Sequence, residues 1–281
     1  MILYPNAKIN LGLAVERRRP DGYHDIATIM LPVDWCDILE IVPADDGRTT
    51  LTTYGRLVDC PPEKNLVIKA YHALSDITGG LPPAHFYLEK IIPDGAGMGG
   101  GSADAAFALT GLNELFNLGL GKDRLALVAA TVGADCPFFI YNRPAWCTGT
   151  GTNIEPCSVD GITGRAILIA KPRVASVSTR EAYAGIKPLP CATDIRSVVN
   201  LPPAQWAPAL YNDFEASIFT KLPAVADVKR RMTDAGAEYT AMTGSGAAVF
   251  GIFANDILAQ KAAAIFPDCD YRVCHEPALN V

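Results

Sequence analysis

Residues 93–106, PDGAGMGGGSADAA, join a predicted strand to a predicted helix through a run of glycines. Five glycines fall in the seven positions 95–101. A tight connection between a strand and a helix needs only one or two glycines with positive φ. The stretch is therefore interpreted as an anion site, in which backbone N–H groups and the positive end of the helix dipole bind phosphate.

The residues around the stretch narrow the class of phosphate site. A Walker loop ends in Gly-Lys-Ser/Thr, and Gly101-Ser102 has no lysine between its members. The segment 95–100 does fit the dinucleotide pattern GxGxxG, which also requires a second strand that carries an acid about 20 residues on. Glu114 has that spacing but lies within the predicted helix, and another helix follows. The nicotinamide interpretation therefore lacks its structural context.

Apolar periodicity and turn residues predict strands and helices in both halves of the chain. The predicted strands cover residues 7–15, 27–33, 37–42, 85–92, 137–141, 145–148, 165–171 and 271–275, and another follows the glycine turn at 243–246. The predicted helices cover residues 65–78, 103–116, 122–132, 179–185, 212–219, 222–235 and 255–266. This mixture indicates an α+β fold, and 281 residues allow two domains or one large one.

Charge and hydropathy exclude several function classes. The net charge is −6 and no basic stripe occurs, so we expect no nucleic acid partner. The basic cluster at 17–19 precedes a Pro-Asp-Gly turn and is interpreted as a solvated loop. The chain does not start like a signal peptide and has no run of about 18 apolar residues. We therefore expect a cytoplasmic protein that does not bind membranes, as a monomer or a weak homodimer.

The cysteines are scattered and form no CxxC pair. This spacing predicts buried thiols in a reducing compartment rather than disulfides or a zinc site. The eight cysteines are at positions 36, 60, 136, 147, 157, 191, 269 and 274.

Five motifs in order give the chain a family resemblance. They are PNAKINLGL at 5–13, RRPDGYHDI at 18–26, the glycine stretch, GADCPFF at 133–139 and TGSGAAVF at 243–250. Together they resemble the GHMP kinases, and within that family the branch whose substrate is 4-diphosphocytidyl-2-C-methyl-D-erythritol. The motifs extend from residue 5 to residue 250, so the resemblance covers nearly the whole chain.

The resemblance implies a fold and a reaction. The expected fold has an N-terminal ribosomal-protein-S5-domain-2-like domain, residues 1–155, and a C-terminal ferredoxin-like α/β domain, residues 156–281, with the active site in the cleft between them. The expected reaction moves the γ-phosphoryl of ATP, with Mg²⁺, onto the 2-hydroxyl of the substrate. It belongs to the non-mevalonate (methylerythritol phosphate) pathway of isoprenoid and terpenoid biosynthesis.

Two residues match catalytic positions of the family. Asp135 would accept the proton of the substrate hydroxyl, although an isolated Asp in such a loop more often makes an Asx turn. Lys8 would keep that carboxylate ionised and stabilise the hydroxyl or the transferring phosphoryl group. Period-2 alternation places Asn10 on the same strand face as Lys8, where it would orient the pair; a solvent-facing strand surface is the alternative.

Other residues match family positions that bind the cytidine part of the substrate. Tyr23 and His24 would meet the base by stacking and hydrogen bonding, or they form a small packing cluster. Thr179 and Tyr183 lie four residues apart on one predicted helix face, and Tyr183 would close an aromatic sandwich around the base.

A further group matches the nucleotide site. Ser102 is expected to cap its helix, to reach Mg²⁺, or both, and Asn65 to contact ATP or to cap the helix after Lys64. A second glycine turn at 243–246 would lie near the substrate diphosphate, with a tight hairpin as the alternative. The predicted ATP-binding residues are Asn65, Pro93, Asp94, Gly95, Ala96, Gly97, Met98, Gly99, Gly100, Gly101, Ser102 and Ala103, and the second turn comprises Thr243, Gly244, Ser245 and Gly246.

Two positions depart from the family pattern. Thr243 stands where serine is common, which keeps a hydroxyl, and Ala103 replaces a second serine after the glycines. The loss of that serine leaves Ser102 alone for the metal or phosphate role.

Three other functions remain as alternatives. A GHMP kinase acting on homoserine, mevalonate or a sugar is disfavoured by Tyr23, His24 and Tyr183, because those substrates have no base to stack. A nicotinamide oxidoreductase is favoured by GxGxxG alone. A non-catalytic nucleotide-binding module is disfavoured by Asp135 together with Lys8.

Overall fold

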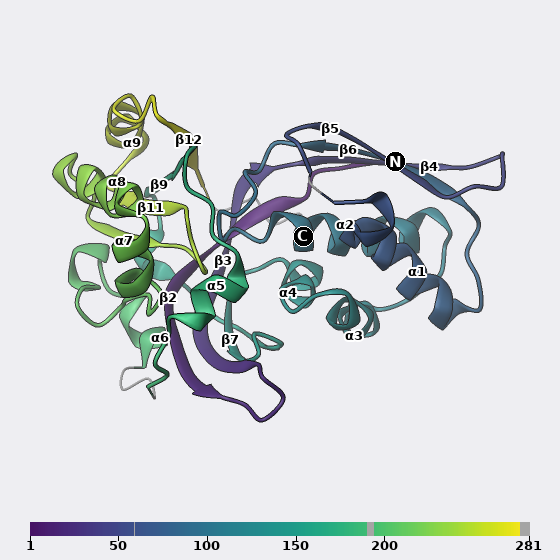
Figure 1. Cartoon of the computed structure of the whole chain (residues 1–281), viewed down its shortest axis with the longest axis horizontal. Helices are drawn as coiled ribbons and strands as arrows, with labels where there is room; N and C mark the ends of the chain where they lie inside the picture. The colour runs from purple at the N-terminus through teal and green to yellow at the C-terminus, as the bar shows by residue number, and fades with distance from the viewer. Residues whose placement is uncertain (59, 190–193, 276–281) are drawn as a thin grey trace. The chain divides into compact units, whose positions relative to one another are not determined.

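The computed structural model describes residues 1–58, 60–189 and 194–275, which form two compact units (Figure 1). The first unit comprises Met1–Ala7, Trp35–Pro93 and Gly99–Arg143. The second comprises Lys8–Asp34, Asp94–Met98 and Pro144–Val281. The units therefore alternate along the chain, whereas the sequence predicted one boundary near residue 155, which stays a prediction. The glycine stretch passes from the second unit to the first between Met98 and Gly99.

The first unit is a sheet with helices on one face. Its strand order is β1-β4-β6-β5, with β5 parallel to β6 and the other pairs antiparallel. The strands are β1 (Ile2–Leu3), β4 (Ile38–Pro43), β5 (Thr50–Gly55) and β6 (Ala84–Lys90), and the helices are η1 (Pro62–Lys64), α1 (Leu66–Thr78), α2 (Gly100–Leu115), α3 (Lys122–Val132) and α4 (Cys136–Tyr141).

A small residue lets α2 approach this sheet closely. A Cβ added to Gly111 would lie 2.5 Å from Leu3 Cδ1 and 2.8 Å from Ile41 Cδ1. Helix α1 packs on the same face, where Tyr71 and Phe86 meet edge to face at 6.1 Å between ring centroids. The face formed by alternate strand residues is therefore the buried one.

A buried ionic cluster connects β6 to the start of α2. Lys90 Nζ donates to Asp37 Oδ2 and, at 2.6 Å, to Asp104 Oδ2. Asp37 Oδ1 also accepts the backbone N–H groups of Ile91 (2.6 Å) and Ile92 (2.8 Å). The ammonium of Lys90 thus connects β6 to both carboxylates.

One carboxyl group of this cluster, that of Asp104, has a raised pKa. Burial, with the neighbouring charge of Asp37, raises the pKa of Asp104 to about 7, although Lys90 acts in the opposite direction. Burial disfavours the charged form of Lys90, but attraction to the two carboxylates outweighs it and raises the Lys90 pKa. Among the described residues, Asp104 Oδ1 has no hydrogen-bond partner, which is consistent with a carboxyl group that takes up a proton easily.

The second unit contains two sheets. The first has the order β2-β3-β7-β8, so the long strands from the start of the chain pair with strands from its middle. This pairing explains why Lys8–Asp34 belongs to the unit that also contains the C-terminal half. The strands are β2 (Asn6–Arg18), β3 (His24–Cys36), β7 (Ala145–Gly149) and β8 (Asn153–Pro156).

The second sheet is ferredoxin-like, as the sequence predicted. Its strands follow one another as β9, β10, β11 and β12 along the chain, and α9 connects β11 to β12. In the sheet they lie in the antiparallel order β10-β11-β9-β12. These strands are β9 (Ala166–Pro172), β10 (Tyr239–Met242), β11 (Val249–Phe253) and β12 (Cys269–Cys274). The helices are α5 (Thr179–Ala184), α6 (Ile195–Val198), α7 (Glu215–Lys221), α8 (Pro223–Asp234) and α9 (Asp256–Ala263), with 3₁₀ turns η2 (Asp160–Ile162) and η3 (Pro203–Gln205).

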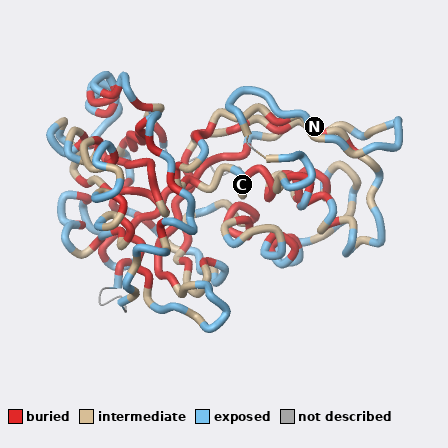
Figure 2. Tube along the Cα trace, viewed as in Figure 1, coloured by how far each residue is buried: buried red, intermediate tan, exposed pale blue. Residues whose placement is uncertain are grey.

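Burial follows this architecture within each unit. Figure 2 shows buried residues concentrated along the strands and on the inner sides of the helices. In the second unit one apolar cluster includes Val15, Leu168, Phe214 and Phe253. Residues from both of its sheets therefore share a core.

One predicted strand is wrong. Residues 137–141 form helix α4, which begins at Cys136 with Pro137 in its first turn. Proline suits the first turn of a helix because its missing N–H would have no intrahelical acceptor there. The apolar run of aromatic residues resembled a strand, and it is too short for its period to separate the two structures. The sequence also did not predict β1, β5, β8, β10 and α6.

The cysteines are free thiols in the described part of the chain. Cys136, Cys147, Cys269 and Cys274 are buried, and Cys36, Cys60 and Cys157 are half-buried. Cys191 lies outside the described residues. In residues 1–58, 60–189 and 194–275, no helix is both long and apolar enough to cross a bilayer.

The buried cluster predicts the effect of removing its lysine. Lys90→Met leaves Asp37 and Asp104 facing each other without a cation and should lower the free energy of unfolding by about 3–5 kcal/mol. Adding Asp104→Asn removes one of the two charges, so the double variant should regain part of that loss. Urea unfolding followed by circular dichroism measures both changes.

The matched control is Lys69→Met, which removes an exposed lysine from α1 in the same unit. Its unfolding midpoint should stay near that of the wild type. Equal losses for the two lysine variants would contradict the role given to the cluster.

Candidate active site

The glycine stretch takes up the strand-to-helix position that the sequence predicted. Gly95, Gly97 and Gly99 have positive φ values of 58°, 72° and 70°. Helix α2 begins at Gly100, with Gly99 at its N-cap. The first N–H groups of a helix have no intrahelical acceptor and lie at the positive end of its dipole. The start of α2 thus has the features of an anion site.

The first two glycines serve packing within the second unit. A Cβ on Gly97 would lie 2.2 Å from the carbonyl oxygen of Thr243, and a Cβ on Gly244 would lie 2.6 Å from the carbonyl oxygen of Gly97. A Cβ on Gly95 would lie 2.3 Å from Ser176 Oγ. The two glycine turns therefore pack backbone against backbone. All five glycines were predicted to bind phosphate, and Gly95 and Gly97 have this additional reason to be glycine.

The last three glycines surround the helix start in the first unit. A Cβ on Gly101 would meet only Leu66 Cδ1, at the ordinary distance of 3.8 Å, and Gly101 is exposed. A Cβ on Gly100 would lie 3.1 Å from Ile92 Cγ2. Space therefore exists above the backbone at Gly101, where a phosphate oxygen would meet the N–H groups.

Ser102 lies inside the first turn of α2. The prediction that it caps the helix is wrong, because the N-cap is Gly99 and no side chain caps this helix. Its hydroxyl lies near the thiol of Cys136, since a Cβ on Gly133 would lie 3.8 Å from Ser102 Oγ and 3.0 Å from Cys136 Sγ. Burial raises the pKa of that thiol to about 12.

Asp135 occupies the N-cap position of α4, not the start of a strand. Its side chain makes no capping hydrogen bond to that helix, and the residue is half-buried. Since Ser102 contacts Cys136, the neighbour of Asp135, the first unit places the start of α2 near the loop that carries the proposed base. Lys8 belongs to the second unit, whereas Asp135 belongs to the first.

Lys8 and Asn10 share a face of β2, as alternation predicted, and the face is buried. Lys8 is 3% exposed and Asn10 is 2% exposed, which contradicts the alternative of a solvent-facing surface. Lys8 Nζ donates to Asn10 Oδ1 at 2.6 Å and to the carbonyl oxygen of Gly97 at 3.0 Å. The Lys8 backbone N–H donates to Met98 O at 3.0 Å. The ammonium group is thereby fixed against the first half of the glycine stretch.

The three residues predicted to contact the base, Tyr23, His24 and Tyr183, lie in the second unit. Tyr23 is 64% exposed at the end of its loop. His24 stacks on Tyr183 with ring centroids 4.7 Å apart, and Tyr183 meets Phe214 edge to face at 4.9 Å. Partial burial, with the positive charge of Arg18, lowers the pKa of His24, so its ring is neutral at pH 7. No base fits between His24 and Tyr183 at this spacing, and a sandwich between Tyr23 and Tyr183 stays a prediction.

Ion pairs order the loop that precedes these aromatic residues. Arg17 Nη2 lies 2.5 Å from Asp25 Oδ2, and Arg19 Nε lies 3.0 Å from Asp21 Oδ2. Asp21 Oδ1 also accepts the backbone N–H of Tyr23 at 3.1 Å. Exposed pairs of this kind contribute little to stability. Their effect is to hold the loop shape that presents Tyr23.

The remaining predicted residues have local contacts. Thr179 Oγ1 lies 3.5 Å from Ser245 Oγ, so α5 and the second glycine turn are adjacent. Asn65 is the N-cap of α1, and its Oδ1 accepts the N–H of Val67 at 2.9 Å. Lys64 ends η1 just before it. The capping role of Asn65 is confirmed, and its contact with ATP stays a prediction.

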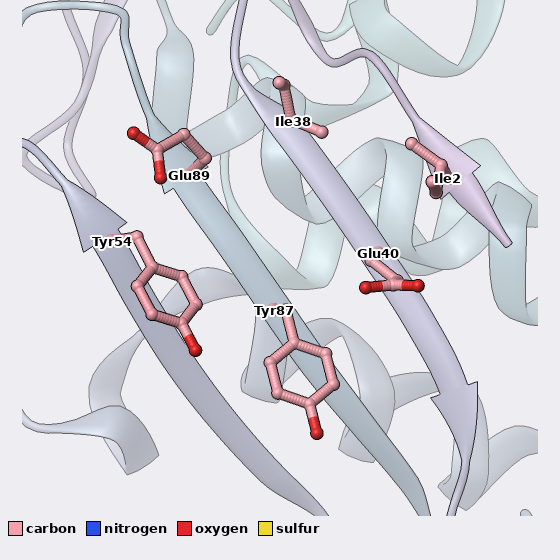
Figure 3. A pocket seen from close by; sticks show the side chains of 6 residues that line it. All are labelled: Ile2, Ile38, Glu40, Tyr54, Tyr87 and Glu89. Carbon is pink, nitrogen blue, oxygen red and sulfur yellow. The ribbon is translucent and has the colours of Figure 1, made fainter.

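A groove on the open face of the sheet of the first unit contains none of these residues (Figure 3). This face is opposite the one that packs on α2, because its residues alternate with buried ones such as Ile41. The groove is lined by Ile2, Ile38, Glu40, Tyr54, Tyr87 and Glu89. It therefore has no part in the site built from the five sequence motifs.

The described side chains form no complete metal site. Among residues 1–58, 60–189 and 194–275, no group of three or more His, Cys, Asp or Glu residues is arranged to hold a metal ion. A magnesium ion that arrives with ATP needs few protein ligands, because the phosphates and water supply most of its oxygens. The Ser102 hydroxyl in the first turn of α2 fits such a partial site.

Several residues near the site were not singled out from the sequence. Thr28 is fully buried and hydrogen-bonds with Asn10, and Lys90 and Asp104 lie beneath the start of α2. Each is a polar residue in an apolar strand or an alanine-rich turn, which is a recognisable signal. Their partners come from distant parts of the chain, so the pairing itself is not visible in the sequence.

Comparison with known proteins agrees with this geometry. The GHMP kinases N terminal domain matches residues 65–143, and the GHMP kinases C terminal domain matches residues 201–271. A 4-diphosphocytidyl-2-C-methyl-D-erythritol kinase of Parabacteroides distasonis is 46% identical over 269 residues, which cover 96% of this chain and 97% of that protein. The protein of the same name from Salinibacter ruber is 37% identical over 280 residues, covering 98% and 97%.

Solved structures give the same result. The chain resembles a crystal structure of 4-(cytidine 5'-diphospho)-2C-methyl-D-erythritol kinase with a TM-score of 0.83 and 29% identity, covering 98% of each chain. A homoserine kinase from Cytophaga hutchinsonii shares the fold, with a TM-score of 0.71 and 20% identity over 97% and 95% of the two chains. On the extent of these matches, the chain belongs to the GHMP kinase family.

Proposed function

We propose that the chain transfers the γ-phosphoryl group of ATP to the 2-hydroxyl of 4-diphosphocytidyl-2-C-methyl-D-erythritol, giving the 2-phosphate and ADP. This reaction is a step of the non-mevalonate pathway of isoprenoid biosynthesis. The observation that carries the proposal is that relatives named for this substrate match about 96% of the chain at 46% identity. The exposed ring of Tyr23 beside the His24 and Tyr183 stack supports a substrate that contains a base.

The glycine stretch and α2 are assigned to the nucleotide. The N–H groups of Gly100, Gly101 and Ser102 have no intrahelical acceptors and would bind phosphate oxygens of ATP. Mg²⁺, when bound with ATP, neutralises charge on the β- and γ-phosphates, and the Ser102 hydroxyl is the side chain we assign to it. The side chain of Asn65 is committed to its cap and is assigned to the edge of the same site.

Asp135 and Lys8 are assigned to the transfer step. Asp135 accepts the proton of the attacking hydroxyl, which is typically worth about 10²- to 10⁴-fold in rate. Lys8 stabilises the negative charge of the transferring phosphoryl group. Asn10 and Gly97 hold its ammonium in place through two hydrogen bonds.

The remaining residues are assigned to the cytidine diphosphate part of the substrate. Tyr23, His24 and Tyr183 contact the base, and neutral His24 has both a donor and an acceptor for its edge. Thr179 lies next to Ser245, so the hydroxyl groups of α5 and the second glycine turn are available to the ribose and the diphosphate. Thr243, Gly244 and Gly246 are buried and Ser245 is half-buried, so Ser245 is the residue of that turn whose side chain is assigned to ligand contact.

The substrate assignment predicts a selective kinase. Wild-type protein with MgATP should release ADP with 4-diphosphocytidyl-2-C-methyl-D-erythritol and much more slowly with mevalonate, homoserine or galactose. A coupled assay of ADP formation measures the four rates under one set of conditions. Preferred turnover of mevalonate, homoserine or galactose would overturn the assignment.

Asp135→Asn keeps the size of the side chain and removes its basic oxygen. We expect kcat to fall by about 10²- to 10⁴-fold, while KM for ATP stays near the wild-type value. Steady-state kinetics measure both constants. Asp76→Asn, at an exposed position of α1 in the same unit, is the control and should keep wild-type kcat. Full activity of the Asp135 variant would remove the base assignment.

Tyr23→Ala tests contact with the base. Loss of one stacking interaction should raise KM for the cytidine-containing substrate by about 5- to 100-fold and leave KM for ATP unchanged. Tyr4→Ala is the matched control, because Tyr4 is exposed to a similar extent, 60% against 64%. An unchanged KM for the cytidine-containing substrate in the Tyr23 variant would argue against stacking.

A further inference from the structure

A buried hydrogen-bond chain lies behind Lys8 in the second unit. Lys8 Nζ donates to Asn10 Oδ1 at 2.6 Å, and Asn10 Nδ2 donates to Thr28 Oγ1 at 3.0 Å. Thr28 is fully buried on β3. The chain therefore joins the ammonium on β2 to a hydroxyl on the neighbouring strand.

The hydroxyl of Thr28 has one proton, which it donates in a hydrogen bond to a carbonyl oxygen. Thr28 Oγ1 donates to the carbonyl oxygen of Gly12 at 2.5 Å, with the carbonyl oxygen of Ile29 at 3.4 Å. A carbonyl oxygen only accepts, so either of these contacts uses the proton of the hydroxyl. Toward Asn10, Thr28 is therefore an acceptor.

This count of protons fixes the orientation of the Asn10 amide. An acceptor at Thr28 requires the NH₂ group of Asn10, which turns Oδ1 toward Lys8. The ammonium of Lys8 only donates, so the opposite orientation would place NH₂ against NH₃⁺. It would also leave Oδ1 facing a hydroxyl with no proton to give. Both ends of the amide thus favour one arrangement.

Thr243 holds the backbone of the same residue. Its Oγ1 accepts the Asn10 backbone N–H at 3.0 Å, and Thr243 is fully buried. With the backbone fixed in this way, rotation of the side-chain amide is the main remaining freedom of Asn10. Thr28 restricts this rotation at the NH₂ end of the amide, while Lys8 and, at 3.5 Å, Thr243 Oγ1 contact its oxygen.

We propose that Thr28 is a positioning residue for phosphoryl transfer, which sets the Asn10 amide and through it the position of the Lys8 ammonium. The inference rests on the proposed function, in which Lys8 stabilises the transferring group. Misplacement of such a group by about 1 Å can cost on the order of 10²-fold in rate. Thr28 itself touches no reacting atom.

The test compares Thr28→Val, which keeps the shape of the side chain and removes the hydroxyl, with Thr28→Ser, which keeps the hydroxyl. We expect kcat of the valine variant to fall by about 10- to 100-fold with KM for ATP unchanged. The serine variant should keep kcat near the wild-type value. Wild-type kcat in the valine variant, or equal losses in both variants, would overturn the proposal.

Loss of stability is controlled separately. Tyr239→Phe removes another buried hydroxyl of the second unit, which donates to Leu210 O at 3.0 Å, and it should lower the unfolding midpoint without a comparable loss of kcat. If Thr28→Val does not fold, Thr28→Ala against Thr28→Ser gives the same comparison of hydroxyl present and absent. An alanine variant as active as the serine variant would then overturn the proposal.

A readout without substrate separates this inference from the proposed function. In protein labelled with ¹⁵N-asparagine, the Asn10 side-chain N–H groups should exchange with solvent faster in Thr28→Val than in the wild type. Asn212 Nδ2, which donates to Met242 O and Gly244 O, is the internal control and should not change. Unchanged exchange at Asn10 would overturn the positioning role, whereas failure of the wild type to use the cytidine substrate would overturn the proposed function alone.

Discussion

In the second unit, two glycine turns lie so close that no side chain fits between their backbones. A Cβ on Gly97 would lie 2.2 Å from the Thr243 carbonyl oxygen, and one on Gly244 would lie 2.6 Å from the Gly97 carbonyl oxygen. Hydrogen bonds from Ala247 and Ala248 to the carbonyl oxygens of Gly95 and Ala96 hold the contact. Because the Gly97 carbonyl also accepts from Lys8, the position of the Lys8 ammonium depends on this backbone contact.

The sequence predicted the anion site at the glycine stretch, but not the packing contacts that two of its glycines make. Gly99, Gly100 and Gly101 form the helix start that an anion site requires, whereas Gly95 also meets Ser176 and Gly97 meets the backbone of Thr243, 146 residues along the chain. A local pattern shows that bare backbone is needed but not what approaches it. The same limit explains why Thr28 was not singled out from the sequence, because its hydroxyl donates a hydrogen bond to the Gly12 carbonyl oxygen on the neighbouring strand.

Period and turn residues predicted most elements because their signals are local. Helix α1 begins at Leu66 after the cap that Asn65 suggested, and α3 has the predicted bounds. The errors fall where local signals conflict with tertiary context, as in α4, whose run of aromatic residues is strand-like while Pro137 suits a first helical turn. Strand β5 was missed because its residues are mostly exposed and carry no alternating apolar pattern.

The two buried lysines near the site are held by different kinds of contact. Lys90 lies between two carboxylates, so its charge is compensated within the first unit and its role is structural. Lys8 donates to the side-chain oxygen of Asn10 and to the carbonyl oxygen of Gly97, so its direction depends on the glycine stretch and on the Asn10 amide. An amide accepts from an ammonium only through its oxygen, which explains why Asn10 needs a fixed orientation.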